Sequence, residues 1–225
     1  MNDDVYGIKK WGNDILEILE NGNIGLKNPF HPDNSPADLI KIIKSLNERG
    51  ISCPVLLRVT DYLAFRIKQI NNSFFRAIRE IRYKGEYKGV FPVKVNQQAQ
   101  VIDRIVEFGK EFDFGLEVGS KPELLIALAH DLSANSTIIC NGIKDREFIH
   151  LAILSIKIGF KTILVLESPR ELDLIIKISK ELNVRPLLGI RVKLTNKVSG
   201  NWSQSSGDRS AFGLSVEQVM EVISK

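Results

Sequence analysis

The sequence is poor in cysteine and has no long apolar run. Its 225 residues include two cysteines, Cys53 and Cys140, without a CxxC pair, which argues against a disulfide framework and a zinc site. The longest uncharged apolar stretches are short, such as residues 162–166, whereas a membrane-spanning helix needs about 20 apolar residues. Acidic residues at positions 3 and 4 stand where a signal peptide is basic. We therefore expect a cytoplasmic protein without a membrane segment.

Charge of either sign is not in large excess, since 31 Lys and Arg against 27 Asp and Glu give a net charge of +4. With 44% hydrophobic and 26% charged residues, the composition is typical of a folded protein rather than a disordered one. The basic residues concentrate over 66–88, which could indicate a nucleic-acid surface. Apolar residues recur there at helical spacing, so we expect an amphipathic helix over 61–81 with a solvated basic face and no nucleic-acid partner. The recurring residues are Leu63, Ile67, Ile70, Phe74, Ile78 and Ile81.

From residue 90 onward, short β-branched segments alternate with amphipathic helical segments. The segments expected to form strands begin at positions 90, 114, 137, 162 and 187, at intervals of 23 to 25 residues. Helices are expected over residues 97–108, 121–129, 145–158 and 169–182, and again from Ser215. Uniformly apolar strands that are each followed by a helix indicate an α/β protein with a parallel sheet.

Two α/β architectures fit this repeat, a doubly wound sheet and a (β/α)8 barrel. The GxGxxG fingerprint of dinucleotide-binding folds is missing after the first strand, where the sequence reads FPVKVNQ. The regular repeat therefore favours a TIM-like barrel, which has eight strands when it is closed. The sequence accounts for about five of them, so we expect a partial (β/α)8 barrel.

The first 60 residues have a different pattern. Asn21-Gly22-Asn23 lies between short apolar segments and predicts a hairpin, and we expect a helix over 37–48 and a strand over 54–59. We therefore divide the chain into an N-terminal β-containing segment, residues 1–60, and a barrel part, residues 61–225. Residues 196–210 are rich in Ser, Gly and Asn, which predicts an irregular loop beside a site.

Polar residues stand at the ends of the expected strands, where the active sites of barrel enzymes lie. Lys94 is the most informative of them, because it falls within an otherwise apolar strand, where an unpaired ammonium would be costly. Burial favours the neutral amine, which can attack an aldehyde to form a Schiff base. A lysine that reaches water or pairs with Glu117 explains the pattern equally well. The strand-end residues are Lys94, Asn96, Glu117, Asn141, Glu167 and Arg191.

Several ordered motifs resemble the biosynthetic arginine decarboxylase family. They are WGN at 11–13, FPVKVNQ at 91–97, GLEVGSK at 115–121, CNGIKDRE at 140–147, LGIRV at 188–192 and FGL at 212–214. The resemblance covers nearly the whole chain and implies a pyridoxal 5′-phosphate enzyme of alanine-racemase-like fold, with a barrel and a β domain. It implies a lyase that converts L-arginine to agmatine and carbon dioxide, a step of arginine catabolism and of polyamine (putrescine and spermidine) biosynthesis.

The resemblance also implies roles for individual residues. Lys94 carries pyridoxal phosphate covalently and acts in catalysis. Glu117 lies beside the cofactor ring and its imine, as a catalytic and cofactor-binding residue, although an ion pair with Lys121 or Arg146 is the structural alternative. Arg191 binds the cofactor at the mouth of the active site. Mg²⁺ as a second cofactor is implied by the resemblance only, and the full-length form is expected to be a homo-oligomer.

Two departures from the family limit what the resemblance implies. Ala211 stands where the family usually has a lysine, and the sequence does not reach the family's ring-stacking histidine, the acid that pairs with the pyridine nitrogen or the C-terminal β domain. We therefore expect this chain to be the N-terminal part of such an enzyme and to be inactive alone. Arginine, rather than another basic amino acid, is the substrate by resemblance only. The alternatives are a non-catalytic pyridoxal-phosphate-binding barrel and a chain that binds no cofactor.

Overall fold

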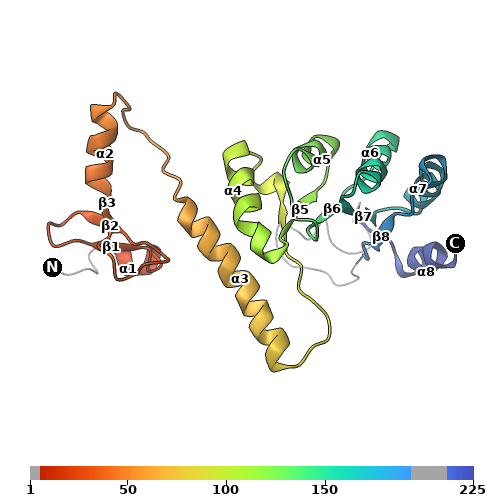
Figure 1. The fold of residues 1–225 in the computed structure, drawn as a ribbon, viewed down its shortest axis with the longest axis horizontal. Helices are drawn as coiled ribbons and strands as arrows, with labels where there is room; N and C mark the ends of the chain where they lie inside the picture. Colours follow the sequence, from red (N-terminus) through yellow and green to blue (C-terminus); the bar gives the residue numbers. More distant parts are fainter. Residues whose placement is uncertain (1–5, 194–211) are drawn as a thin grey trace. The chain divides into compact units, whose positions relative to one another are not determined.

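The structure, a computed structural model, describes residues 6–193 and 212–225. The chain divides into two compact units, Met1–Ile70 and Asn71–Lys225 (Figure 1). The loop predicted over residues 196–210 and the Ala211 position lie outside the described residues. Within the described ranges, no helix is long and apolar enough to cross a membrane.

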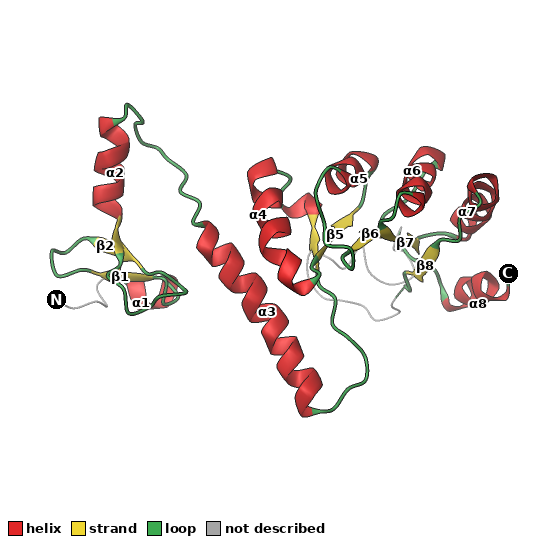
Figure 2. Ribbon diagram, viewed as in Figure 1, coloured by secondary structure: helices red, strands yellow, loops and turns green. Residues whose placement is uncertain are grey.

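The first unit contains a small antiparallel sheet in the order β1-β2-β3 (Figure 2). β1 (Leu16–Ile18) and β2 (Ile24–Leu26) form the predicted hairpin, and Gly22 in its turn has the positive φ of +81° that favours glycine. β3 (Ala37–Asp38) pairs with β2. The helices of this unit are α1 (Ile8–Trp11), α2 (Leu39–Glu48) and the first part of α3 (Thr60–Glu80), which confirms the helix predicted over 61–81.

Asp38 joins the hairpin to the helix that follows it. Its Oδ1 accepts hydrogen bonds from the backbone N–H groups of Ile40 and Lys41 at 2.9 and 3.3 Å, which caps α2. Its Oδ2 accepts hydrogen bonds from the side-chain amides of Asn21 and Asn23 at 3.1 and 2.9 Å. One carboxylate therefore fixes both the turn of the hairpin and the start of the helix.

Two predictions for the first unit need correction. The helix expected over 37–48 begins at Leu39, because Ala37–Asp38 extend the sheet instead. The strand expected over 54–59 is wrong, since these residues have no regular secondary structure and belong to neither of the described sheets. Pro54 has no N–H to offer a neighbouring strand, and Leu56 is 75% exposed, so the segment gains nothing from a sheet face.

The second unit alternates strands with helices as the sequence predicts. The five strands and four helices expected from residue 90 onward are confirmed, and so is the helix after Ser215. The strands are β4 (Val90–Pro92), β5 (Gly115–Val118), β6 (Thr137–Cys140), β7 (Lys161–Leu166) and β8 (Leu187–Ile190). The helices are α4 (Ala99–Gly109), α5 (Lys121–Leu128), α6 (Arg146–Lys157), α7 (Pro169–Leu182) and α8 (Val216–Ser224), with short 3₁₀ helices η1 (Val93–Val95) and η2 (Lys110–Phe112).

The five strands are parallel and lie in chain order, β4-β5-β6-β7-β8. A doubly wound sheet reverses its strand order at one point and carries helices on both faces, whereas a barrel does neither. Figures 1 and 2 show α4, α5, α6 and α7 in a row along one face of the sheet, and α5, α6 and α7 contact one another in turn. The expectation of a partial (β/α)8 barrel is therefore confirmed.

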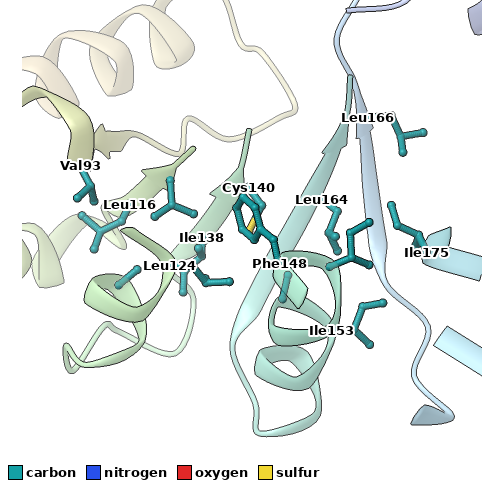
Figure 3. Close-up of a cluster of buried hydrophobic side chains, with 14 of the residues drawn as sticks. Val93, Leu116, Leu124, Ile138, Cys140, Phe148, Ile153, Leu164, Leu166 and Ile175 are labelled. Atoms are coloured by element: carbon teal, nitrogen blue, oxygen red, sulfur yellow. The ribbon is translucent and has the colours of Figure 1, made fainter. Parts of the chain in front are cut away.

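The hydrophobic core of this unit lies between the sheet and its helices (Figure 3). Alternate residues of β7 illustrate the arrangement, because Leu164 and Leu166 are fully buried. Ile163 and Val165, on the other face of the same strand, are only partly buried, since none of the described helices of this unit packs on that face. The helices contribute further fully buried side chains to this core, among them Leu124, Ile149, Ile153 and Ile178. Packing thus leaves the inner face of the sheet open for a site.

Two adjacent leucines in α5 provide a test of this packing. Leu124 is fully buried, whereas Leu125 is 56% exposed. We predict that Leu124→Ala lowers the free energy of unfolding by about 2–5 kcal/mol, through lost burial and a residual cavity. Leu125→Ala, the matched control, should change it by no more than about 0.5 kcal/mol. Denaturant titration of both variants measures the difference, and equal losses would contradict the arrangement.

Candidate functional site

A cavity of about 1100 Å³ lies at the carboxyl ends of the strands. Parallel strands bring residues distant in sequence to this edge, so η1 supplies Lys94, β5 supplies Glu117 and the segment after β8 supplies Arg191. The three predicted site residues therefore line one cavity, together with Asn141, which follows β6. Asn96 and Glu167, the other strand-end candidates, are not among its lining residues. The remaining lining residues include Pro92, Gly119, Glu123, Gly142, Ile143, Val165, Ile190 and Phe212.

The environment of Lys94 differs from the prediction. The sequence predicts Lys94 within a buried strand, but β4 ends at Pro92 and Lys94 lies in the 3₁₀ helix that follows. Pro92 is paired with Glu117, so the 3₁₀ turn begins just beyond the last strand pair. In this tighter turn Val93 is fully buried, whereas Lys94 is exposed at the cavity. Its amine is therefore accessible to a ligand rather than buried among apolar side chains.

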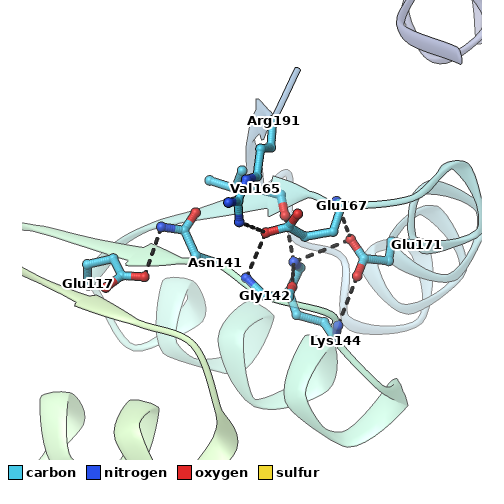
Figure 4. Close-up of polar contacts among 8 residues, drawn as sticks. All are labelled: Glu117, Asn141, Gly142, Lys144, Val165, Glu167, Glu171 and Arg191. Carbon is cyan, nitrogen blue, oxygen red and sulfur yellow. Dashed lines mark hydrogen bonds and ion pairs between the residues drawn. The ribbon is translucent and has the colours of Figure 1, made fainter. Parts of the chain in front are cut away.

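Glu117 is buried on the inner face of the sheet, with 7% of its surface exposed. Its Oε1 accepts a hydrogen bond of 2.9 Å from the side-chain amide of Asn141 (Figure 4). Its Oε2 is buried and has no hydrogen-bond partner among the described residues. A buried carboxylate oxygen without a partner is costly, and because Glu117 lines the cavity, a donor group bound there could satisfy this oxygen.

The structural alternative for Glu117, an ion pair with Lys121 or Arg146, is not observed. Lys121 pairs with Asp145 at 2.8 Å, and Arg146 pairs with Glu181 at 3.2 Å. The hydrogen bond from Lys121 holds the pKa of Asp145 below its usual value, and this carboxylate also caps α6. Both basic residues thus pair at the outer rim of the unit, and neither forms an ion pair with Glu117 in the cavity.

Arg191 is held on two sides. Its Nη1 donates a hydrogen bond of 3.1 Å to Glu167 Oε1, and its guanidinium lies over the ring of Phe212, 5.2 Å from the centroid. The side chain of Glu167 is completely buried, whereas that of Arg191 is 50% exposed. The same Glu167 oxygen accepts a 2.9 Å hydrogen bond from the backbone N–H of Gly142. The guanidinium is therefore anchored at one end and open to the cavity at the other.

Two buried residues near the cavity, Lys144 and Glu171, were not predicted. The side chain of Lys144 has no exposed surface, and its Nζ lies 3.3 Å from Glu171 Oε2. Lys144 falls between the strand predicted from residue 137 and the helix predicted over 145–158, and a lysine at such a position normally points to water. A usable signal was the repeat Ser-x-x-Glu at 120–123 and 168–171. In both repeats the glutamate accepts a hydrogen bond from the backbone N–H four residues before it, that of Gly119 or Glu167, at 2.8 and 2.9 Å.

The geometry of the cavity agrees with the family to which the chain is related. Residues 67–225 match the family model described as pyridoxal-dependent decarboxylase, pyridoxal binding domain. The chain belongs to this family. The match covers the five parallel strands whose carboxyl ends surround the cavity.

The chain is similar to proteins named biosynthetic arginine decarboxylase. It is 45% identical over 222 residues to one from Gloeobacter violaceus, covering 99% of this chain and 34% of that protein. It is 47% identical over 218 residues to one from Prochlorococcus marinus, covering 97% of this chain and 34% of that protein. The chain therefore spans about a third of the length of the curated relatives it matches.

Solved structures show the same fold. The crystal structure of the biosynthetic arginine decarboxylase from Campylobacter jejuni matches with a TM-score of 0.83 at 33% identity, covering 98% of this chain and 34% of that one. Diaminopimelate decarboxylase from M. jannaschii in co-complex with L-lysine matches with a TM-score of 0.67 at 23% identity, covering 95% and 44%. The second likeness concerns the fold alone.

The cavity residues fit pyridoxal phosphate. Lys94 offers an accessible amine for the aldehyde, Arg191 offers guanidinium donors to an anion, and Glu117 has a carboxylate oxygen that lacks a partner among the described residues. A metal ion needs several ligand side chains close together, and the described residues contain no group of three or more His, Cys, Asp or Glu placed to hold one. The Mg²⁺ implied by the resemblance therefore has no such ligand group in the described ranges.

Cys140 is the last residue of β6, and its reactivity reports whether the end of this strand is buried. It is fully buried, and burial raises the pKa of its thiol to about 12. The thiol therefore stays protonated and shielded at mildly alkaline pH, whereas Cys53 is exposed. We predict that Ellman's reagent modifies one thiol per folded chain, Cys53, and both thiols after denaturation. Cys53→Ser should remove the fast reaction, while rapid modification of Cys140 in the folded protein would contradict its burial.

Proposed function

We propose that this chain binds pyridoxal phosphate covalently through Lys94, as the cofactor-binding part of a decarboxylase. The observation that carries the proposal is the convergence of Lys94, Glu117 and Arg191 on one cavity in a member of the pyridoxal-binding family. Lys94 is the one lysine among the described residues that line that cavity, and an accessible amine is what an aldehyde requires.

Each residue has a distinct part in this proposal. Bound pyridoxal phosphate supplies an electron sink for the carbanion left when carbon dioxide departs. Lys94 holds the cofactor, and Glu117 Oε2 accepts a hydrogen bond from a protonated group beside it, while Asn141 fixes the other oxygen. Arg191 binds an anionic group with the donors that Glu167 leaves free. The closed helical side of the sheet keeps water from the back of the site.

We further propose that the longer protein converts L-arginine to agmatine and carbon dioxide in polyamine biosynthesis. Support comes from the 45–47% identity to proteins named biosynthetic arginine decarboxylase over 97–99% of this chain. A cytoplasmic location and a homo-oligomeric full-length form complete the proposal, and the two free cysteines agree with a reducing compartment. Because the chain spans about a third of these relatives, catalysis is assigned to the longer protein.

Titration with pyridoxal phosphate tests the role of Lys94. We predict that the chain develops the visible absorbance of lysine-bound pyridoxal phosphate and that Lys94→Ala abolishes it, because the imine then has no amine. Lys161→Ala is the matched control, since Lys161 is exposed at the opposite end of the sheet, where β7 begins. This variant should behave as the wild type. An unchanged spectrum in Lys94→Ala would rule out Lys94 as the attachment point.

Release of labelled carbon dioxide from carboxyl-labelled L-arginine tests the activity. We predict cofactor binding without carbon dioxide release by the 225-residue chain, because only five of the eight strands of a closed barrel are found in the described residues. A full-length relative serves as the positive control. Release by the 225-residue chain alone would contradict the assignment of catalysis to the longer protein.

A further inference from the structure

We propose that Lys144 and Glu171 are positioning residues that set the orientation of Glu117 and Arg191 in the cavity. Neither residue lines the cavity, and neither is assigned a role by the family match. The inference rests on the proposed function for its effect on pyridoxal phosphate. Its structural part, the placement of the two strand-end turns, stands on the contacts of this chain alone (Figure 4).

The ammonium of Lys144 ties together the ends of two strands. Its Nζ donates hydrogen bonds to the backbone carbonyl of Gly142, after β6, at 2.6 Å and to that of Val165, in β7, at 2.5 Å. Its third neighbour is Glu171 Oε2 at 3.3 Å. An ammonium has three N–H donors, so each donor has one acceptor. This complete pairing distinguishes Lys144 from a lysine that is buried only along its stem.

The carboxylate of Glu171 holds the backbone of both turns. Its Oε1 accepts a hydrogen bond from the N–H of Lys144 at 2.8 Å, and its Oε2 accepts one from the N–H of Glu167 at 2.9 Å. Glu171 lies in the first turn of α7 and is 4% exposed. It therefore fixes the turn after β6 and the turn after β7 relative to the same helix.

These turns carry the partners of the two cofactor-binding candidates. The turn after β6 carries Asn141, which binds Glu117, and the turn after β7 carries Glu167, which binds Arg191. Gly142 links the two, because its N–H donates to Glu167 while its carbonyl accepts from Lys144. Gly142 has a φ of +75°, and a Cβ at this position would lie 2.9 Å from the backbone oxygen of Gly119, which follows β5. The turn after β6 is therefore packed tightly against the turn after β5. A shift of the turn after β6 would therefore move both partners.

The test compares two ion pairs, the buried pair Lys144–Glu171 and the exposed pair Arg146–Glu181. The double variant Lys144→Met/Glu171→Gln removes both buried charges together, so that neither is left unpaired. Arg146→Met/Glu181→Gln is the matched control, because it makes the same kind of change at an exposed ion pair between the same two helices. Glu171→Gln alone is a milder second variant, which keeps the volume but can accept only one of the two backbone bonds at an oxygen.

Two measurements distinguish an effect on the position of the strand-end turns from an effect on the stability of the unit. Amide exchange without cofactor reports the turn directly, and we expect the Gly142 N–H to exchange about tenfold faster or more in the Lys144 and Glu171 variants, while Ile153 in the core of α6 stays protected. Titration with pyridoxal phosphate should show about tenfold weaker binding, a typical cost of losing a contact that supports a ligand-binding residue. The control should match the wild type in both.

The outcomes distinguish this inference from the proposed function. Unchanged Gly142 exchange and unchanged cofactor affinity in the folded variants would overturn it. Loss of the fold in both variants would also overturn it, because the pair would then act on the stability of the unit rather than on the turns. If the wild type itself binds no pyridoxal phosphate, the proposed function fails, and Gly142 exchange alone decides whether Lys144 and Glu171 position the turns.

Discussion

Five parallel strands end at one edge of the sheet, and the buried polar groups gathered there need hydrogen-bond partners within the protein. Glu171 meets this need in the first turn of α7, since its two oxygens accept from the backbone N–H groups of Lys144 and Glu167, and its Oε2 also faces the Lys144 ammonium. Glu167 in turn binds Arg191 and Gly142. Glu167 and Glu171, which do not line the cavity themselves, therefore hold the strand-end turns beside it.

The one-sided packing of the sheet explains where this cavity lies. Side chains such as Leu164 and Leu166 fill the space between β7 and the helices, so the apolar contribution to stability is concentrated on the outer face. The inner face carries partly buried apolar residues such as Ile163 and Val165, and polar residues gather at the strand ends. Glu117 occupies that inner face with one oxygen fixed by Asn141 and the other without a partner in the described residues. Stability and ligand binding are thus assigned to opposite faces of the same strands.

Much of the fold was predictable because hydrophobic periodicity reports burial directly. The regular spacing of strands from Val90 onward predicted the parallel sheet, and the strand-end rule found Lys94, Glu117 and Arg191. Local geometry was less predictable: Pro92 signals that the strand can end there, but FPVKV does not indicate that Lys94 enters a 3₁₀ turn and is exposed. Lys144 was missed for a related reason: its burial depends on acceptors from β7 and α7, more than 20 residues away along the chain.

The proposed role of this cavity depends on Lys94 as the attachment point of pyridoxal phosphate. The most direct measurement is borohydride reduction of the chain after incubation with the cofactor, followed by peptide mapping by mass spectrometry. If Lys94 is the attachment point, the stable pyridoxyl label is found on the peptide that contains Lys94, in a ratio of about one per chain. Label spread over surface lysines, or concentrated on another lysine such as Lys144, would contradict it.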